Sequence, residues 1–398
     1  MRALAVSSDG TRVISGSFDT TAIRWSLTSS TAEKVLRFHE GAVNCVVFLK
    51  DGRMATSGED TRIAIWRPGD DKPMIVLQGH SAPVVGLAVS PDGATLASAA
   101  WDHTARLWPL SGGEPRVLEG HRQNVNGVAF SPDGRALLTA GYDATLRIWP
   151  LAGGGSPTIV TLPTPLNTVV IAPDGDIVTA GASGKVYFLS SAGEPKGEVE
   201  AVAVPIIALA LSGDGKVVAA ASVRGSVAVI ERTGRTLERT LVGPGMPAWS
   251  ATFLPDNRTL LTGGTDRLIR RWNALTGEPI GEVAMGGPED PLAAYAGDPG
   301  AEVFRACVAC HTLKADEGVR AGPTLAGIFG RRIATLPGYD FSVALKKLDI
   351  VWTSETVAKL FEVGPAAYTP GTKMPEQRVG PEDRVALMKF LEKATNKR

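Results

Sequence analysis

Short apolar runs recur along the first 285 residues at a nearly constant interval, and tryptophan marks the end of most of them. The first four of these tryptophans stand 41, 42 and 41 residues apart, and each follows an aspartate by six positions: Trp25, Trp66, Trp108 and Trp149. The same pair returns at Asp266 and Trp272, and the register passes through Leu189 and Ile230 in between. This spacing predicts seven copies of one unit built from short strands and tight turns.

Turn residues recur with the same period. A Ser-Pro-Asp-Gly-like turn precedes a strand of small residues in successive units, as in Ser90–Gly93 and Ser131–Gly134. Gly79-His80 and Gly120-His121 add a second mark, of which His39 is a weaker copy. A period of 40–45 residues with these marks resembles WD40 repeats, which implies an all-β, seven-bladed WD40 propeller over residues 1–285. Units five and six lack the His, the Asp and the Trp.

The WD40 resemblance gives the histidines a structural role, although a set of three suggests metal ligands at first sight. It implies a buried hydrogen-bond network of His, Ser or Thr, Asp and Trp within a blade. The members expected here are His80, Ser98, Asp102 and Trp108 in one unit, and His121, Thr139, Asp143 and Trp149 in the next.

The last hundred residues show helices joined by loops rich in Gly and Pro. Asp298-Pro299 predicts the start of a helix that runs through Cys307, because an Asp cap and a first-turn Pro favour helix initiation. Thr353 or Ser354 caps a second helix that stops at Gly364-Pro365. Pro381 opens the last helix, in which Val385, Met388 and Leu391 recur at three-residue spacing.

The most informative motif is Cys307-Val308-Ala309-Cys310-His311, because C-x-x-C-H is the attachment site of a c-type haem. Two thiols form thioethers with the porphyrin, and the imidazole that follows reaches the iron. Zinc is the alternative, but it needs further Cys or His ligands. The third cysteine, Cys45, lies far upstream, and no other His follows His121.

Residues 298–398 resemble a class I cytochrome c of the mitochondrial or alphaproteobacterial type. The motifs C-x-x-C-H, G-P-x-L-x-G-x-x-G-R, G-Y-x-x-S, a lone Trp and P-G-T-K-M occur in family order. The resemblance implies an all-α domain with one covalent haem c, His311 as proximal ligand and Met374 as distal ligand. It also implies that the Pro323 carbonyl accepts the second N–H of His311, which fixes the ring.

The same resemblance places Arg331, Tyr339 and Trp352 beside the haem propionates. Phe341 departs from the family pattern, which has a second tyrosine there. One hydroxyl donor to a propionate is therefore expected to be missing.

Composition supports two domains and a short connection. A Gly/Pro-rich linker is expected at 286–297, between a propeller over 1–285 and a cytochrome domain over 298–398. The 398-residue chain has no net charge, but 15 Lys and Arg against 12 Asp and Glu make residues 296–398 about +3, and the remainder about −3. No apolar run approaches the ~20 residues of a membrane span. Nothing in the sequence supports nucleic-acid binding.

The function expected from these features is electron transfer, with the iron cycling between ferric and ferrous states and the propeller serving as a protein-docking platform. The partner would be a redox protein such as a dehydrogenase, an oxidase or a respiratory complex. Aromatic residues expected on one face of the ring are the candidate contacts: Phe18, Trp101, Tyr142 and Trp249. No catalytic motif stands out. Two alternatives remain, an oxidoreductase whose propeller holds a substrate or second cofactor, and a redox-responsive scaffold or sensor.

The expected location is the periplasm, because bacterial c-type cytochromes mature outside the cytoplasmic membrane. No signal peptide precedes the first predicted strand, Ala3–Val6. We therefore expect that a signal segment is missing from this chain or that the chain is the mature form.

Overall fold

The computed structural model describes residues 1–153, 155–242, 246–266, 268–283, 292–308, 310–315, 322–339, 341–372, 374 and 379–395. The chain forms two compact units, Met1–Pro288 and Glu289–Arg398. Residues 286–291 of the predicted linker lie outside the described residues. The rest of that segment is packed, because Leu292 is buried and Tyr295 contacts Phe390 in the core of the C-terminal unit.

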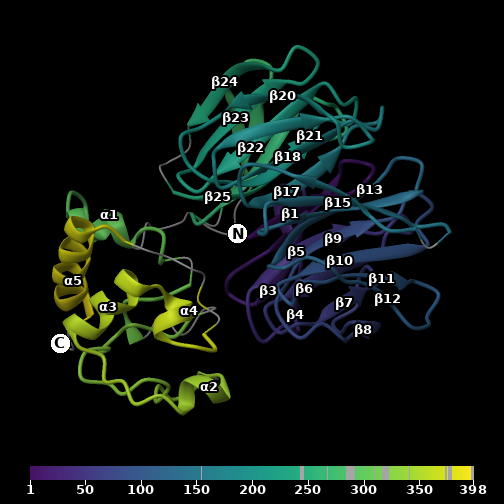
Figure 1. Ribbon diagram of the computed structural model, residues 1–398. Helices are drawn as coiled ribbons and strands as arrows, with labels where there is room; N and C mark the ends of the chain where they lie inside the picture. Colours follow the sequence, from purple (N-terminus) through teal and green to yellow (C-terminus); the bar gives the residue numbers. More distant parts are fainter. Residues whose placement is uncertain are drawn as a thin grey trace. The chain divides into compact units, whose positions relative to one another are not determined.

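The N-terminal unit consists of seven antiparallel sheets of four strands each, and the strands of each sheet are consecutive in the chain (Figure 1). The first four blades contain β1 Ala3–Val6, β2 Arg12–Gly16, β3 Thr21–Ser26, β4 Thr31–Arg37, β5 Val43–Phe48, β6 Met54–Gly58, β7 Ile63–Trp66, β8 Ile75–Leu77, β9 Val84–Val89, β10 Thr95–Ala100, β11 Ala105–Pro109, β12 Arg116–Leu118, β13 Val125–Phe130, β14 Ala136–Gly141, β15 Thr145–Pro150 and β16 Thr158–Thr161. The last three contain β17 Leu166–Ile171, β18 Ile177–Gly181, β19 Lys185–Leu189, β20 Pro195–Glu200, β21 Ile206–Leu211, β22 Val217–Ser222, β23 Ser226–Glu231, β24 Thr236–Val242, β25 Ala248–Phe253, β26 Thr259–Gly264, β27 Ile269–Asn273 and β28 Pro279–Val283.

The first strands of successive blades contact one another, and β1 contacts β25, which closes the ring. The predicted seven-bladed propeller is therefore confirmed. The last blade takes its outer strand from β28, so all four of its strands come from one stretch of chain. At the junction of the first and last blades the Arg2 guanidinium lies 5.0 Å from the ring of Trp249 and 5.8 Å from the ring of Phe18. These cation–π contacts stabilise the closure.

Buried polar networks hold the second, third and fourth blades. In the third blade Trp108 Nε1 lies 2.8 Å from Ser98 Oγ, which lies 2.7 Å from His80 Nε2, and His80 Nδ1 lies 2.7 Å from Asp102. Blade four repeats these contacts with His121. The second blade has the complete network around His39 as well, with Thr56 at 2.8 Å and Asp60 at 2.9 Å. The sequence had suggested only a weaker copy there.

Blades five and six replace the network with close backbone packing onto glycine. A Cβ on Gly181 would stand 1.8 Å from the Pro165 carbonyl oxygen, and one on Gly225 would stand 2.2 Å from the Met246 oxygen. The loop before blade five and the loop after blade six therefore lie directly against the turns that correspond to the Asp turns of blades two to four. This explains how the two blades keep their shape without the His, Asp and Trp.

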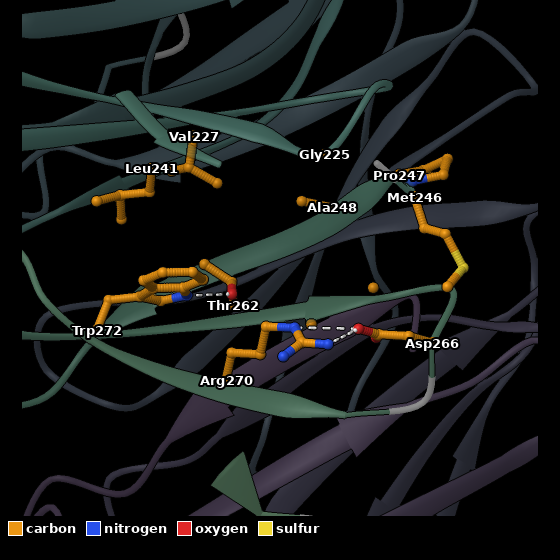
Figure 2. Close-up of a pocket in the computed structure, with 12 residues that line it drawn as sticks. Gly225, Val227, Leu241, Met246, Pro247, Ala248, Thr262, Asp266, Arg270 and Trp272 are labelled. Carbon is orange, nitrogen blue, oxygen red and sulfur yellow. Dashed lines mark hydrogen bonds and ion pairs between the residues drawn. The ribbon is translucent and has the colours of Figure 1, made fainter. Parts of the chain in front are cut away.

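The seventh blade keeps part of the network (Figure 2). Trp272 Nε1 donates to Thr262 at 2.9 Å, while Asp266 accepts from Arg270 at 2.6 Å where blades two to four use a histidine. A cavity of about 20 Å³ lies among these residues. The histidine network therefore distinguishes blades two to four from the others, whereas all seven blades share the four-strand pattern.

The C-terminal unit consists of short helices joined by loops, with one isolated β-bridge between Arg332 and Val351. Its helices are η1 Ala293–Tyr295, α1 Pro299–Phe304, α2 Val343–Lys346, α3 Ser354–Val363, α4 Pro365–Tyr368 and α5 Pro381–Thr395. Because few residues are helical, the expected all-α class I fold is supported only in part. In the described residues no helix is both long and apolar enough to cross a membrane.

The C-terminal unit is stabilised by helix N-caps and by the close crossing of two of its helices. Asp298 caps α1 by accepting from Gly300 at 2.9 Å, and Thr353 caps α3. Helices α1 and α5 cross closely at Gly300, where a Cβ would stand 2.2 Å from the Ala386 carbonyl oxygen. Val385, expected on the buried face of α5, is 57% exposed. Met388 and Leu391, the other two residues of the repeat, are buried, and Leu387 and Phe390 are buried beside them.

Candidate functional site

One helical turn after α1 carries the Cys and His residues of the C-x-x-C-H motif. The backbone N–H of Cys307 donates to Phe304 at 2.7 Å, and the N–H of His311 donates to Cys307 at 2.9 Å. Helix α1 formally ends at Phe304, three residues before the predicted end, but the hydrogen-bonded turns continue. Cys307 is 8% exposed, and burial raises the pKa of its thiol to about 12. Cys310 and His311 are half-buried.

The His311 ring is fixed from two sides. Its Nδ1 lies 2.8 Å from the Pro323 carbonyl oxygen, so we assign the proton to Nδ1, which donates to that oxygen. In this tautomer Nε2 carries the lone pair, the form in which imidazole binds a metal ion. The ring also lies directly against Gly322, whose Cβ, if present, would stand 2.4 Å from His311 Cε1.

Gly322 is a site residue that the sequence reasoning missed. It was visible as part of a Gly-Pro pair, but pairs of this kind mark many turns. Its N–H donates to Cys310 at 2.9 Å, and Leu325 donates to Thr312 at 2.8 Å, so two segments run side by side here. The glycine is needed because of this close approach, which only the tertiary structure reveals.

Arg331 and Trp352 come together through backbone pairing. The Trp352 N–H donates to Arg331 at 2.9 Å, and the Gly330 N–H donates to Trp352 at 2.8 Å. The Arg331 guanidinium donates to the carbonyls of Thr324 at 2.9 Å and Ala326 at 3.2 Å. Burial lowers the pKa of Arg331, and no carboxylate of the described residues pairs with it. Within the same residues the Trp352 indole N–H donates no hydrogen bond. Both side chains are suited to an anion.

Tyr339 is half-buried and packs edge-on against Phe341, with ring centroids 4.7 Å apart. The phenylalanine that departs from the family pattern therefore still forms an aromatic pair. Its contact supports the tyrosine by packing and offers no hydroxyl.

Met374 follows a turn in which Thr372 donates to Thr369 at 3.0 Å and Gly371 has a left-handed φ of +83°. The Met374 N–H donates to Thr372 at 3.1 Å, and its half-buried side chain packs against the core that contains Cys307. Ser342 donates to Gly371 at 2.9 Å, which anchors the turn to the start of α2. Lys373 lies outside the described residues.

The zinc alternative finds no support in the part of the chain that the structure describes. No three His, Cys, Asp or Glu side chains there lie close enough to hold a metal ion. None of the three cysteines forms a disulfide bond.

The four aromatic residues expected on one propeller face differ in their environments. Phe18 is only 7% exposed and packs on Trp249 at 5.4 Å, because both belong to the ring closure around Arg2. Trp249 is half-buried and donates to Thr265 at 3.0 Å. Trp101 is half-buried and donates to Asn126 at 3.0 Å. Tyr142 is 45% exposed. The expectation of an exposed ring therefore fails at Phe18 and holds best at Tyr142.

Comparison with known proteins assigns the C-terminal unit. Residues 297–395 match the family model "Cytochrome c". Cytochrome c of Cochliobolus lunatus is 43% identical over 98 residues, which are 24% of this chain and 90% of that protein. Cytochrome c of Arabidopsis thaliana is 43% identical over 98 residues, or 24% of this chain and 87% of that protein, and cytochrome c type-1 of Ascaris suum is 40% identical over 114 residues, or 28% and 96%. The chain belongs to the cytochrome c family.

The cytochrome c match covers only the C-terminal unit, and the N-terminal unit belongs to a second repeat family. Five segments match the model "WD domain, G-beta repeat": residues 1–26, 30–67, 71–109, 112–150 and 235–273. The gap between the last two segments contains blade five and the first three strands of blade six, the two blades that lack the His, Asp and Trp. The chain is thus a WD40 propeller followed by a cytochrome c domain.

Membership of the cytochrome c family implies a haem c cofactor and supports haem-based electron transfer, while the WD40 propeller suggests protein interaction. The residues of the cytochrome domain fit such a group. His311 has one fixed nitrogen, Gly322 leaves room for its ring, and Arg331 is a half-buried cation without a carboxylate partner in the described residues.

Proposed function

We propose that the cytochrome c domain holds one covalent haem c, with His311 and Met374 as axial ligands, and carries one electron at a time. The observation that carries this proposal is the His311 ring, held by Pro323 at 2.8 Å and packed on Gly322. A ring fixed in this way presents Nε2 in one orientation. Haem supplies the reversible change between ferric and ferrous iron, and the protein contributes ligation, burial and docking.

Each predicted residue has a distinct part in this proposal. Cys307 and Cys310 would hold the haem through two thioether bonds, each formed by addition of the S–H group across a vinyl double bond, which leaves no atom over. The Met374 thioether would stabilise ferrous iron more than a second histidine ligand would, which would raise the reduction potential. Arg331 and the Trp352 indole would hold a propionate, and Tyr339 stands in the same part of the sequence motif. A propionate beside Arg331 would offset the burial that lowers the pKa of this side chain.

The propeller is proposed to dock a redox partner, such as a dehydrogenase, an oxidase or a respiratory complex. WD40 membership supports a protein-binding role, and Trp101 and Tyr142 are aromatic residues on neighbouring turns of one face. Aromatic residues on rigid turns are frequent binding hot spots. Phe18 is excluded from this proposal by its burial, and Trp249 has a role in ring closure.

The proposed location is the periplasm, because covalent haem attachment in bacteria takes place outside the cytoplasmic membrane. Expression behind a signal peptide, together with haem-maturation genes, should give red protein. Expression in the cytoplasm should give apo-protein. Holoprotein formed without export would contradict this location.

The haem assignment is tested by substitution of its proposed ligands. Met374→Ala should lower the reduction potential and open a site for cyanide or carbon monoxide, whereas His311→Ala should prevent stable haem incorporation. Cys307→Ala with Cys310→Ala should leave no colour after denaturation in acid acetone. An unchanged potential in Met374→Ala would exclude this ligand. A stoichiometric second chromophore or metal in the purified protein would favour the oxidoreductase alternative.

A further inference from the structure

A groove lies between the third and fourth blades of the propeller, and its volume is about 590 Å³. Its floor consists of apolar side chains: Leu107, Pro109, Phe130 and Leu151. Two Ser-Pro-Asp-Gly turns, β9–β10 and β13–β14, form the rim. In an up-and-down blade these turns lie at the opposite end of the strands from the turns with Trp101 and Tyr142. The groove therefore opens on the other face of the ring.

The two turn aspartates present ionised carboxylates at this rim. Asp92 Oδ1 accepts from Ser90 Oγ at 2.5 Å and from the Ala94 N–H at 2.9 Å. Asp133 Oδ1 accepts in the same way from Ser131 Oγ at 2.6 Å and from the Arg135 N–H at 3.0 Å. The serine hydroxyl is the largest cause that lowers the pKa of each aspartate, followed by the backbone N–H. One oxygen of each is held by its turn, and the carboxylate stays charged.

Negative charge exceeds positive charge in the groove wall. The carboxylates of Asp92, Asp133 and Glu114 line it, with Arg116 as the single cation. Arg116 donates to the Leu151 carbonyl at 3.2 Å. Lys50 stands beside the rim and donates to the Pro91 carbonyl.

Arg135, the other cation near the rim, is 87% exposed and lies 3.9 Å from Asp133. An ion pair this exposed and this long contributes little free energy, so a cation closer to Asp133 can take the place of Arg135. The wall thus has room for added positive charge.

The next groove around the ring differs from this one in volume and in the partners of its turn aspartates. The groove between blades four and five has the same register, with Asp133 and Asp174 on its two rims, but a volume of about 280 Å³. There the carboxylate of Asp174 is bound by Arg232. Of these two grooves, the one between blades three and four has the larger volume and two turn aspartates that no buried arginine neutralises.

We propose that this groove binds an extended segment of a partner protein in which an arginine or lysine stands next to an aliphatic or aromatic side chain. The apolar side chain would cover Leu107, which is 8% exposed, and Phe130. The cation would lie among Asp92, Asp133 and Glu114, where charge complementarity favours it. The inference rests on the docking part of the proposed function and adds the place and chemistry of the contact. It is independent of the haem site.

Peptide binding to the full holoprotein tests the proposal. The probe is a fluorescein-labelled, end-blocked peptide, Gly-Ser-Arg-Leu-Arg-Ser-Gly, followed by fluorescence anisotropy. It should bind roughly 10-fold more tightly than the same peptide with Gln in place of Arg, and than the peptide with Ser in place of Leu. The affinity should fall as salt rises, because partly exposed charges are screened.

Matched variants locate the site. Asp92→Asn with Asp133→Asn removes two charges but keeps the Oδ1 acceptors of the turns, and should weaken binding about 5- to 10-fold. Asp9→Asn with Asp214→Asn changes the same turn position in blades one and six, where Ser7 and Ser212 donate at 2.6 Å and 2.7 Å. This control should bind like the parent. Glu114→Gln alters an exposed side chain only and should weaken binding about 2-fold.

Three results would overturn the proposal: equal affinity for the Gln peptide, an equal loss in the Asp9 and Asp214 control, or displacement of the probe by spermine as efficiently as by the unlabelled peptide. The last result would mean that charge alone is recognised. The absorption spectrum of each variant is recorded alongside. Peptide binding by a parent protein that shows no haem spectrum would contradict the haem proposal and leave the groove intact, whereas lost binding with an unchanged spectrum would concern the groove alone.

Discussion

In the third blade, the indole of Trp108 donates to Ser98, the Ser98 hydroxyl donates to His80, and His80 donates to Asp102. Burial by itself would raise the pKa of Asp102, but the hydrogen bonds from His80 and Thr104 outweigh burial and hold this pKa below its usual value. Each member has a partner, so the network rigidifies the blade at no cost from unsatisfied polar groups. Residue identity matters here because the loss of one member leaves its neighbours unpaired.

Ser98→Ala should therefore destabilise the propeller more than an ordinary hydroxyl deletion. It leaves Trp108 and His80 without their shared partner, and we expect a loss of about 2–3 kcal/mol in the free energy of unfolding, measured by urea denaturation. The matched control is Ser15→Ala in the first blade, where Trp25 donates to Ser15 at 2.9 Å and no histidine takes part. That control should lose about 1 kcal/mol. Equal losses would show that the histidine adds nothing.

In the cytochrome domain a single missing methyl group decides where a histidine ring can lie. Gly322→Ala would place a Cβ 2.4 Å from His311 Cε1, so the ring must move and its 2.8 Å contact with Pro323 must lengthen. We expect a lower yield of holoprotein and a shifted reduction potential, measured by absorption and redox titration. Gly380→Ala is the control, since nothing lies within 4 Å of a Cβ there. Normal haem content and a normal reduction potential in Gly322→Ala would contradict the proposed position of the His311 ring.

At the scale of elements, the turn between the second and third strands of each of the first six blades contains one residue with left-handed φ. Blades five and six use Gly184 and Gly225, with φ of +77° and +85°. The first four blades place other residues there, with φ between +61° and +73°: Thr20, Thr61, His103 and Ala144. A residue with a Cβ is strained in this region, so these turns are held by the hydrogen bonds of the blade.

Ala144→Gly should relieve this strain in the fourth blade. We expect a gain of up to about 1 kcal/mol in the free energy of unfolding, reduced by the added freedom of the unfolded chain. The reverse change, Gly184→Ala, should cost several kcal/mol, because it adds strain and places a Cβ 2.0 Å from the Val202 carbonyl oxygen. Thermal unfolding of both variants provides the measurement, and a stabilised Gly184→Ala would refute the argument.

At the scale of the whole molecule, the propeller repeats one carboxylate in every blade. Each lies in the turn between the first and second strands and has a lowered pKa: Asp9, Asp51, Asp92, Asp133, Asp174, Asp214 and Asp256. In Asp9 the Ser7 hydroxyl is the largest cause and brings the pKa to about 2. Arg53 has this role for Asp51, and Arg232 has it for Asp174.

These shifts predict how stability depends on pH. A carboxyl whose pKa is lower in the folded state than in the unfolded state stabilises the fold above the unfolded pKa, about 3.9, and loses this contribution as pH falls. These carboxylates should therefore keep their contribution to stability between pH 7 and 5 and lose it progressively below about pH 4.

Calorimetry at pH 7, 5, 4 and 3 is the measurement. Asp9→Asn with Asp214→Asn, which keeps the turn acceptors, should flatten the decline below pH 4. An unchanged decline would show that other groups govern acid unfolding.

The sequence alone determined the seven-bladed architecture of the propeller and identified the cytochrome c domain. A 41-residue period sets seven blades, because each repeat can bury its apolar strands only against the next one. C-x-x-C-H and the other motifs in family order predicted the cytochrome c domain, which the family match confirms. The repeat also predicted the hydrogen-bond networks of His80 and His121, which the structure confirms. In α5 the three-residue spacing identified Met388 and Leu391 as buried residues but was wrong for Val385, which is exposed near the start of the helix.

Only the tertiary structure decided the remaining features. Phe18 was predicted at the surface, but it is buried where β25 meets β1, a contact between residues some 230 positions apart that no local pattern encodes. Gly322 became a site residue because a second segment brings it against His311. The groove between blades three and four exists because two turns, strands of both blades and two loop segments meet there. Period and motif determine which elements form, whereas packing between distant segments determines which side chains share one space.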